Sequence, residues 1–432
     1  MTTKLNAGAT AQTFDITHGV QRTRLDNGLT LLIKEIHGKP LVSSIIWYRV
    51  GSRNEELGQT GKSHFLEHML FKGTDRYVKG EIDLLTLQNG GANNAFTDTD
   101  YTAYYFNFAA DRWQVALEIE ANRMTHNAFV LEEYESEKEV VEEELRIGLD
   151  SPWGALDQTV WAAAYHQHPY HNPVIGWLED LESATRDEME AYYRQWYHPR
   201  NATLVIVGDI NTEQVQTRVQ ELFGAIPAGP EPKPMTLREQ AQRGERRLIV
   251  KKQTEVERLQ IAWHAPEVMH ADSYPLQLLA TLLSTGKTSR LYQRLEERDQ
   301  SVTHQSVEYS DRIDPTLFVI RAEIKPSHQT AAVERAIYEE IDRLQQAPVS
   351  AEELQRAKQL IKARFVLSHE QVANQAITLG YYETINRYEY LSDFFLRIGE
   401  VSAADIQRAV QKYFVEDRRT VGYLVNDGAK QQ

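Results

Sequence analysis

Alternating hydrophobic and polar residues near the start of the chain predict a β-hairpin over residues 20–36, with Asp26-Asn27-Gly28 at its turn. An apolar run predicts a strand at 41–50. Apolar residues that recur every three or four positions predict helices, and two short alternating runs predict further strands. The expected helices cover 60–72, 80–90, 111–124 and 131–149, and the further strands cover 91–97 and 102–108. This mixture is typical of an α+β fold.

The pattern of the first half returns about 216 residues later, in units that each read as helix, turn and strand or as a single strand. Three pairs of residues mark the repeat: Trp47 and Trp263, Tyr197 and Tyr413, and Thr203 and Thr420. We therefore expect two homologous domains, each a mostly antiparallel sheet covered by helices on one side.

A proline-rich stretch near the midpoint, GAIPAGPEPKPM at 224–235, has no hydrophobic periodicity and predicts a linker. The expected organisation is an N-terminal domain at 14–224, a linker at 225–245 and a C-terminal domain at 246–432.

The composition narrows the chemistry. The 432 residues are 41% hydrophobic and 25% charged, as in ordinary globular proteins, and the chain has no cysteine. Disulfides, thiol nucleophiles and thiolate metal sites are therefore excluded. A net charge of -15 argues against a nucleic-acid partner and against anionic lipid. No apolar run is long enough for membrane insertion.

The first residues, MTTKLNAGATAQTFD, lack the apolar core of a secretory signal, so we expect no signal peptide in this chain. A polar leader before the first strand suits a processed exported protein, and the expected compartment is the periplasm in preference to the cytoplasm.

The segment that carries chemistry is His64-Phe65-Leu66-Glu67-His68. On a helix, residues i and i+4 share a face, so His64 and His68 can reach one ion, and Glu67 stands beside it. Two histidines and a neighbouring glutamate in the order H-x-x-E-H suit metal-assisted peptide hydrolysis. The alternative is an amphipathic helix with surface histidines.

A catalytic zinc needs a third protein ligand, which must here be His, Asp or Glu. The helix expected at 131–149 is rich in acids. Glu137 and Glu144 are spaced to share the apolar stripe of this helix with Val140 and Val141, and buried carboxylates need a cation or a proton. Both are candidate site residues, although a partly buried ion pair would also explain them.

With these residues in view, the chain resembles the M16 family of inverted-motif zinc peptidases, which includes mitochondrial processing peptidase and pitrilysin. The segments that carry the resemblance are HFLEHMLFKGT at 64–74, EKEVVEEE at 137–144, GANNAFTDTDYTAYY at 91–105, HPYHNPVIGW at 168–177 and YHPRNATLVIVGD at 197–209. The short M16B type, which pairs two such chains into a clam-shell, is the most similar.

The resemblance implies that His64, His68 and Glu144 bind one Zn²⁺ per chain. It implies that Glu67 is the general base, which takes a proton from the attacking water and returns it to the leaving amine. Glu137 matches an acid that supports the zinc ligands without binding the metal.

The resemblance further implies that Asn94, Ala95 and Phe96 lie on an edge strand that docks peptide substrates in extended form.

One departure concerns the substrate clamp. Family members carry an Arg and a Tyr in the C-terminal domain that hold the substrate carbonyl, and this chain has Glu296 and Thr303 at those positions. Arg298 could replace the arginine, but no tyrosine follows it. We therefore expect a heterodimer whose homologous partner lacks the zinc motif and supplies the Arg/Tyr pair.

Two alternatives remain at this point. His166, His168 and His171 could form a second metal site, although histidines in a proline-rich loop more often shape the turn. The whole chain could also be a non-catalytic assembly or core subunit of M16 type, but such chains usually lose the zinc motif, and this one keeps it.

Overall fold

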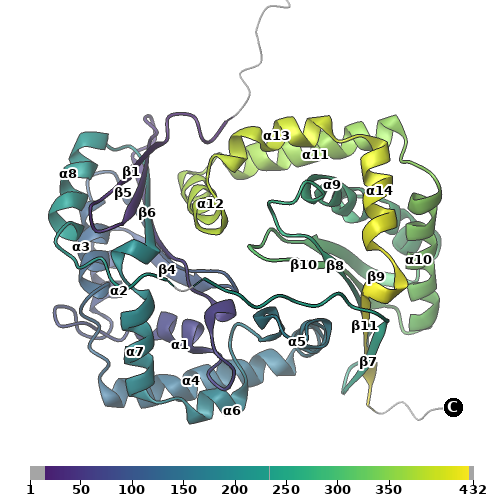
Figure 1. Ribbon diagram of the computed structural model, residues 1–432, viewed down its shortest axis with the longest axis horizontal. Coiled ribbons are helices and arrows are strands. Elements are labelled where there is room, and N and C mark those ends of the chain that lie inside the picture. Colours follow the sequence, from purple (N-terminus) through teal and green to yellow (C-terminus); the bar gives the residue numbers. More distant parts are fainter. Residues whose placement is uncertain (1–14, 233, 428–432) are drawn as a thin grey trace, which may run out of the picture.

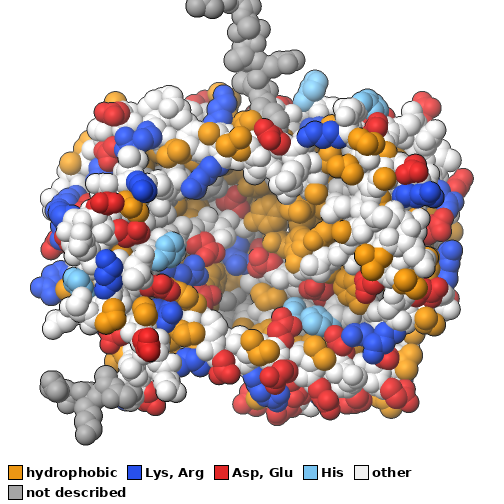
Figure 2. All heavy atoms as spheres, turned by 180° about the vertical axis from the view of Figure 1, so that it is seen from behind, with side chains coloured by type: hydrophobic (Ala, Val, Ile, Leu, Met, Phe, Trp, Pro, Cys, Tyr) orange, Lys and Arg blue, Asp and Glu red, His pale blue; other side chains and the backbone are white. Residues whose placement is uncertain are grey.

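The computed structural model describes residues 15–232 and 234–427, and its two halves face each other, with the N-terminal half on the left of Figure 1. Seen from behind, the surface is hollowed in the middle of the molecule, and hydrophobic side chains gather along the wall of the hollow (Figure 2). The polar leader and the outermost residues of the expected domain ranges lie outside the described residues.

The N-terminal half contains a six-stranded sheet in the order β1-β2-β6-β3-β5-β4. Its strands are β1 (Gln21–Arg24), β2 (Thr30–Glu35), β3 (Leu41–Tyr48), β4 (Ala92–Thr97), β5 (Thr102–Ala109) and β6 (Ala202–Gly208). All neighbours are antiparallel except β2 and β6. The hairpin and the three strands expected from the pattern are confirmed.

The C-terminal half contains a five-stranded sheet in the order β7-β11-β8-β10-β9. Its strands are β7 (Arg246–Lys252), β8 (Glu257–Ala265), β9 (Val302–Tyr309), β10 (Thr316–Ile324) and β11 (Arg419–Asn426). This is the order of the first sheet without β1, with β7 and β11 as the parallel pair. Trp47 pairs with Thr203 and Trp263 with Arg419, so the repeat extends to strand register at an offset of 216 residues. The expected match of Thr203 with Thr420 is wrong by one residue, because this register makes Arg419 the counterpart of Thr203. The α+β fold with two homologous domains is confirmed.

The helices of the first half are α1 (Lys62–Met69), α2 (Glu81–Gln88), α3 (Gln114–Arg123), α4 (Leu131–Asp150), α5 (Pro152–Ala164), α6 (Leu178–Ser183), α7 (Arg186–Trp196) and α8 (Thr212–Phe223). Those of the second half are α9 (Ser273–Ser284), α10 (Thr330–Gln346), α11 (Ala351–Ser368), α12 (Val372–Ile385), α13 (Tyr390–Glu400) and α14 (Ala403–Tyr413). Short turns of helix lie at η1 (Ser52–Asn54), η2 (Pro169–His171), η3 (Pro199–Asn201), η4 (Tyr292–Arg298) and η5 (Glu416–Arg418). The four expected helices are α1 to α4.

Each sheet also receives one helix from the other half. Helix α12 packs on the face of the first sheet that carries Ile45 and Trp47, and α5 packs on the face of the second sheet that carries Ala262 and Leu424. Helices α1, α3 and α8 of the first half and α9, α10 and α14 of the second half pack on the opposite faces. The expectation of helices on one side therefore holds within each half, and the exchanged helices cover the second face and tie the halves together.

Between Phe223 and Arg246, the described residues form no helix or strand. The boundaries at 14–224, 225–245 and 246–432 stay our proposal, since α5 and α12 cross them in space. Among the described helices, none combines the length and apolar character that a membrane span requires.

Candidate metal and catalytic site

Helix α1 presents the motif. It begins after Gly61, whose φ of 86° is a conformation that glycine adopts most readily. Oxygens of the buried Glu55 carboxylate accept hydrogen bonds from the backbone N–H groups of Gly61 and Ser63, each at 2.7 Å. These N–H groups have no partner within the helix, so Glu55 fixes the turn that precedes His64.

Helix α4 supplies the facing acids. Its buried stripe runs through Tyr134, Glu137, Val141 and Leu145, and the ring of Tyr134 stacks on that of Phe65 in α1 at 5.0 Å. The expected burial is therefore confirmed for Glu137. It is wrong for Val140 and Glu144: Val140 is exposed, and the side chain of Glu144 is 50% exposed because it faces the open side of α1.

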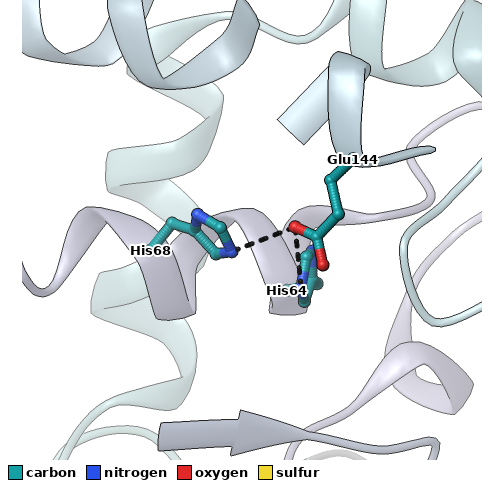
Figure 3. Close-up of side chains that lie close together, drawn as sticks. All are labelled: His64, His68 and Glu144. Carbon is teal, nitrogen blue, oxygen red and sulfur yellow. Dashed lines mark ion pairs between the residues drawn. The ribbon is translucent and has the colours of Figure 1, made fainter. Parts of the chain in front are cut away.

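The two histidines and Glu144 converge (Figure 3). One oxygen of Glu144, Oε2, lies 3.5 Å from Nε2 of His68 and 3.8 Å from Nε2 of His64. The three candidate ligand atoms all lie within 4.8 Å of one another, and among the described residues no other group of three His, Asp or Glu side chains is so arranged. Ligands of a tetrahedral zinc with bonds of 2.0–2.1 Å are about 3.3 Å apart, so this donor set fits zinc.

The pKa values of the two histidines are shifted in opposite directions. Burial, reinforced by the neighbouring His68, lowers the pKa of His64 to about 4, so its imidazole is neutral at pH 7. Burial lowers the pKa of His68 as well, but the hydrogen bond and charge of Glu137 outweigh this and leave the pKa above its ordinary value. Since Nδ1 of His68 lies 2.8 Å from Oε1 of Glu137, Nε2 is the atom left to face Glu144.

Glu137 itself has a second partner. Lys72, one turn after His68, forms an ion pair with the other oxygen of Glu137. Burial raises the pKa of Glu137, and the hydrogen bonds from His68 and Lys72 bring it below its ordinary value. The carboxylate therefore stays charged while it orients His68.

Glu67 lies between α1 and the sheet. It is buried, with 9% of its surface exposed, and its Oε2 accepts a 2.6 Å hydrogen bond from the hydroxyl of Thr97. Burial raises the pKa of Glu67, and the Thr97 hydrogen bond opposes this without cancelling it. A carboxylate with a raised pKa accepts a proton more readily near neutral pH.

Strand β4 forms the outer edge of the first sheet and carries Asn94, Ala95 and Phe96. Asn94 pairs with Tyr105 and Phe96 with Ala103, both on β5, and no described strand pairs with the other side of β4. The exposed Asn94 accepts a hydrogen bond from the backbone N–H of Ala95 at its own side-chain oxygen.

The two clamp positions lie in the second half. Glu296 is in η4, and Thr303 is at the start of the edge strand β9. The hydroxyl of Thr303 lies 3.3 Å from Glu323, whose other oxygen accepts a hydrogen bond from the indole of Trp153 on α5. Arg298 pairs with the adjacent Asp299 and is largely exposed.

Sequence reasoning missed three neighbours of the motif, namely Glu55, Lys72 and Thr97. Lys72 and Thr97 lie inside the segments that carry the family resemblance, whereas Glu55 gave no signal. His168 does not fit a second metal site, because its Nδ1 accepts from the backbone N–H of Tyr170 and its Nε2 lies 3.2 Å from Asp314.

Helix α1 carries two histidines and Glu67 in the inverted order H-x-x-E-H, and α4 places Glu144 and the buried Glu137 opposite them. This arrangement is typical of a zinc protease. Two family models match the chain: "Insulinase (Peptidase family M16)" over residues 30–177 and "Peptidase M16 inactive domain" over residues 183–361. The chain belongs to the M16 family of zinc proteases.

Curated relatives agree. The chain is 28% identical over 426 residues to the zinc protease PqqE of Helicobacter pylori, covering 97% of this chain and 95% of that one. It is 27% identical to the uncharacterized zinc protease YmxG of Bacillus subtilis, covering 92% of this chain and 96% of that protein.

Solved structures show the same fold. A protease from Helicobacter pylori matches with a TM-score of 0.91 at 28% identity, covering 94% of this chain and 99% of that one. The periplasmic protease PqqL of Escherichia coli matches with a TM-score of 0.78 at 20% identity; the match covers 94% of this chain and 48% of that one.

Proposed function

We propose that this chain is a zinc endopeptidase in which His64, His68 and Glu144 hold the metal and Glu67 is the general base. The observation that carries the proposal is the convergence of the three donor atoms within 4.8 Å, with the Glu67 carboxylate on the same helix as the two histidines. A zinc ion at this position supplies Lewis acidity, which polarises a peptide carbonyl and lowers the pKa of water.

Glu67 moves the proton. Its carboxylate takes a proton from the attacking water, stays close to the scissile bond, and returns the proton to the leaving amine. The hydrogen bond from Thr97 holds one oxygen, so the other is left for the water. Burial supports this role because it raises the pKa of Glu67 toward the range in which the carboxylate can both accept and release a proton.

The free edge of β4 is the proposed substrate site. A peptide that adds to this edge as an extended strand bonds through its backbone, alongside Asn94, Ala95 and Phe96. Such binding reads backbone shape more than side chains, so we expect unfolded peptides of varied sequence as substrates. The hollow between the halves suits peptides that enter an enclosed chamber.

We propose further that the active form is a heterodimer. Glu296 and Thr303 stand where the family carries the substrate-holding Arg and Tyr, so the zinc-bearing chain lacks its own clamp. A homologous partner that lacks the zinc motif and carries the pair would complete the site in a clam-shell. Because every member of the zinc motif is assembled here, catalysis is better supported than the alternative of a non-catalytic core subunit.

The test is to purify the native protein with whatever binds it, and to measure zinc and cleavage of an unstructured peptide before and after separation. We expect one zinc ion per chain, a homologous companion, and cleavage only by the complex. Full activity of the separated chain would overturn the heterodimer, and a zinc-free chain with no activity in any form would overturn the peptidase assignment.

The compartment remains a prediction, with the periplasm preferred to the cytoplasm. Fractionation of the source cells, with one marker enzyme for each compartment, tests it directly.

A further inference from the structure

The loop between β9 and β10 reaches from the C-terminal half into the N-terminal half. Within it, Arg312 forms an ion pair with Asp98 at 3.0 Å, and the backbone N–H of Ile313 donates to Asp100 at 3.1 Å. Asp314 receives hydrogen bonds from Arg53 at 3.1 Å, through Nε, and from Arg238 at 2.6 Å. Three consecutive residues of this loop therefore bind the other half or the linker.

The loop residues of these contacts are buried, whereas the side chains of their partners Asp98 and Arg238 are 40% and 66% exposed. The side chain of Arg312 is 13% exposed and lies over the rings of Trp161 and Tyr170, at 5.2 Å and 5.3 Å. Asp100 and Asp314 are almost wholly buried. Charges in such surroundings are costly unless paired, so removing one partner leaves the other uncompensated and favours local rearrangement.

The contacts of the loop between β9 and β10 with the first sheet converge on a single turn. Asp98 and Asp100 belong to the turn at 98–101 that joins β4 to β5, and Arg53 also approaches Asp100 at 3.3 Å. From the other side, the backbone N–H groups of Ser52 and Arg53 donate to the carbonyl groups of Asp98 and Thr99, at 3.3 Å and 2.9 Å. The turn is thus held between η1 and the loop of the second half.

This turn begins directly after Thr97, which ends β4 and donates to Glu67 at 2.6 Å. A chain of contacts therefore runs from the second half to the base. Arg312 pairs with Asp98 in the turn. Asp314 acts on the turn through Arg53, which also approaches Asp100. The turn ends the edge strand, and the strand places the Thr97 hydroxyl. The second half has no ligand in the metal triad, yet it supports the strand beside it.

We propose that Arg312 and Asp314 are positioning residues for the peptidase reaction, which act through the turn at 98–101 to hold β4 and the hydroxyl of Thr97 against Glu67. The inference rests on the proposed role of Glu67 and gives the loop a task beyond joining the halves. The coupling is carried by a rigid strand and by buried ion pairs, which transmit displacement because close-packed interiors yield little.

The competing explanation is a purely structural tie, which would lower stability without acting on β4. The positioning role and the structural tie predict changes in different measured properties of the loop variants. A positioning role predicts local opening of β4 and a loss of turnover that passes through Thr97. A structural tie predicts a lower unfolding temperature with the β4 amides protected from exchange as in wild type. It also predicts that the loop variants and Thr97→Val lower kcat independently, so that their effects add in activation free energy.

The experiment compares Arg312→Lys and Asp314→Asn with the exposed control variants Arg335→Lys and Asp342→Asn. Arg312→Lys keeps the charge and loses the planar fork, so it serves if Asp314→Asn does not fold. Hydrogen exchange of the β4 amides is measured on each folded protein. The kcat and KM of each loop variant are measured in the native complex, first with the loop substitution alone and then with Thr97→Val added to it.

We expect β4 amides to exchange about tenfold faster in the two loop variants and kcat to fall by at least about tenfold, with the controls unchanged. Thr97→Val should add no further loss to either loop variant. Unchanged exchange of the β4 amides in the folded variants would overturn the proposal. So would a fold-loss of kcat in the combined variants that equals the product of the separate fold-losses of the loop variant and of Thr97→Val. If the wild-type complex cleaves no peptide, the proposed function fails, and exchange in β4 alone decides the coupling.

Discussion

Nδ1 of His68 lies 2.8 Å from Oε1 of Glu137, which is 69 residues further along the chain. The contact joins α1 to α4 and assigns the proton of the imidazole, because the nitrogen that faces the carboxylate carries it and leaves Nε2 as the donor toward a metal. The orientation of His68 in the proposed metal site therefore depends on an acid that does not itself belong to the triad.

Replacing this acid should weaken zinc binding. In Glu137→Gln the negative charge beside His68 is lost, and the neutral amide holds the imidazole ring less firmly. We therefore expect zinc affinity to fall by about 10- to 100-fold. Chelator competition measures it. Glu139→Gln, on the exposed face of the same helix, is the matched control and should bind zinc as wild type does. Equal affinities for the two variants would contradict the role of Glu137.

Removing the metal should abolish peptide cleavage without unfolding the protein. Helices α1 and α4 are joined by buried apolar residues, including the Phe65 and Tyr134 stack, and these contacts need no ion. We expect the chelated protein to keep its circular dichroism spectrum and a cooperative transition. Zinc at 1,000 times its Kd should restore about 4 kcal/mol of stability. Loss of secondary structure on chelation would show that the metal is needed for folding.

Restoring the clamp should make the partner dispensable. The double variant Glu296→Arg with Thr303→Tyr places both missing groups on the zinc-bearing chain, and a homodimer of it would then contain complete sites. We expect the isolated double variant to cleave an unstructured peptide at least about tenfold faster than the isolated wild type, since clamp contacts to the carbonyl act in the transition state.

Two variants control this experiment. Glu297→Arg adds the same charge at an exposed neighbouring position and should gain nothing. Adding Glu67→Gln to the double variant should remove the gained activity. Equal, low activity of the isolated wild type and of a well-folded double variant would contradict the clamp interpretation.

Acid should loosen the contact between α5 and the second sheet. Nε2 of His264 lies 2.8 Å from the carbonyl oxygen of Ala164, and burial lowers the pKa of His264 to about 4. The unfolded chain takes up a proton near pH 6.5 and the folded one does not, so stability falls as the pH drops from about 6.5 to 4. For this group the loss is about 3 kcal/mol.

His264→Gln keeps a donor for Ala164 and cannot titrate. Chemical denaturation at several pH values should therefore show a shallower loss of stability for His264→Gln than for wild type over the same range, with no difference in slope above pH 7. Parallel curves throughout would exclude His264 as a source of acid lability.

Sequence patterns predicted the elements that position the motif because each signal is local. The spacing of His64 and His68 is set by one helical turn, and the spacing of strands by alternation. The burial expected for Glu144 was wrong because helical periodicity cannot distinguish a face that packs on the core from one that lines an open site. Val140 misled in the same way, since it lies one residue from the buried Val141.

Contacts between distant segments could not be predicted. The exchange of α5 and α12 between halves depends on which sheet each apolar face meets, and periodicity does not encode this. Arg312 and Asp314 sit in a short loop with no motif, and only the fold brings them to the turn beside Thr97. The hydrogen bond from Thr97 to Glu67 likewise depends on how β4 lies over α1.

The central claim is that Glu67 performs proton transfer beside a metal that His64, His68 and Glu144 hold. The most direct test is peptide cleavage by Glu67→Gln and by wild type, each in the native complex and at equal measured zinc content. We predict that both hold one zinc ion per chain and that kcat of the variant is lower by about 10²–10⁴-fold. A zinc-loaded Glu67→Gln that cleaves at the wild-type rate would contradict the account.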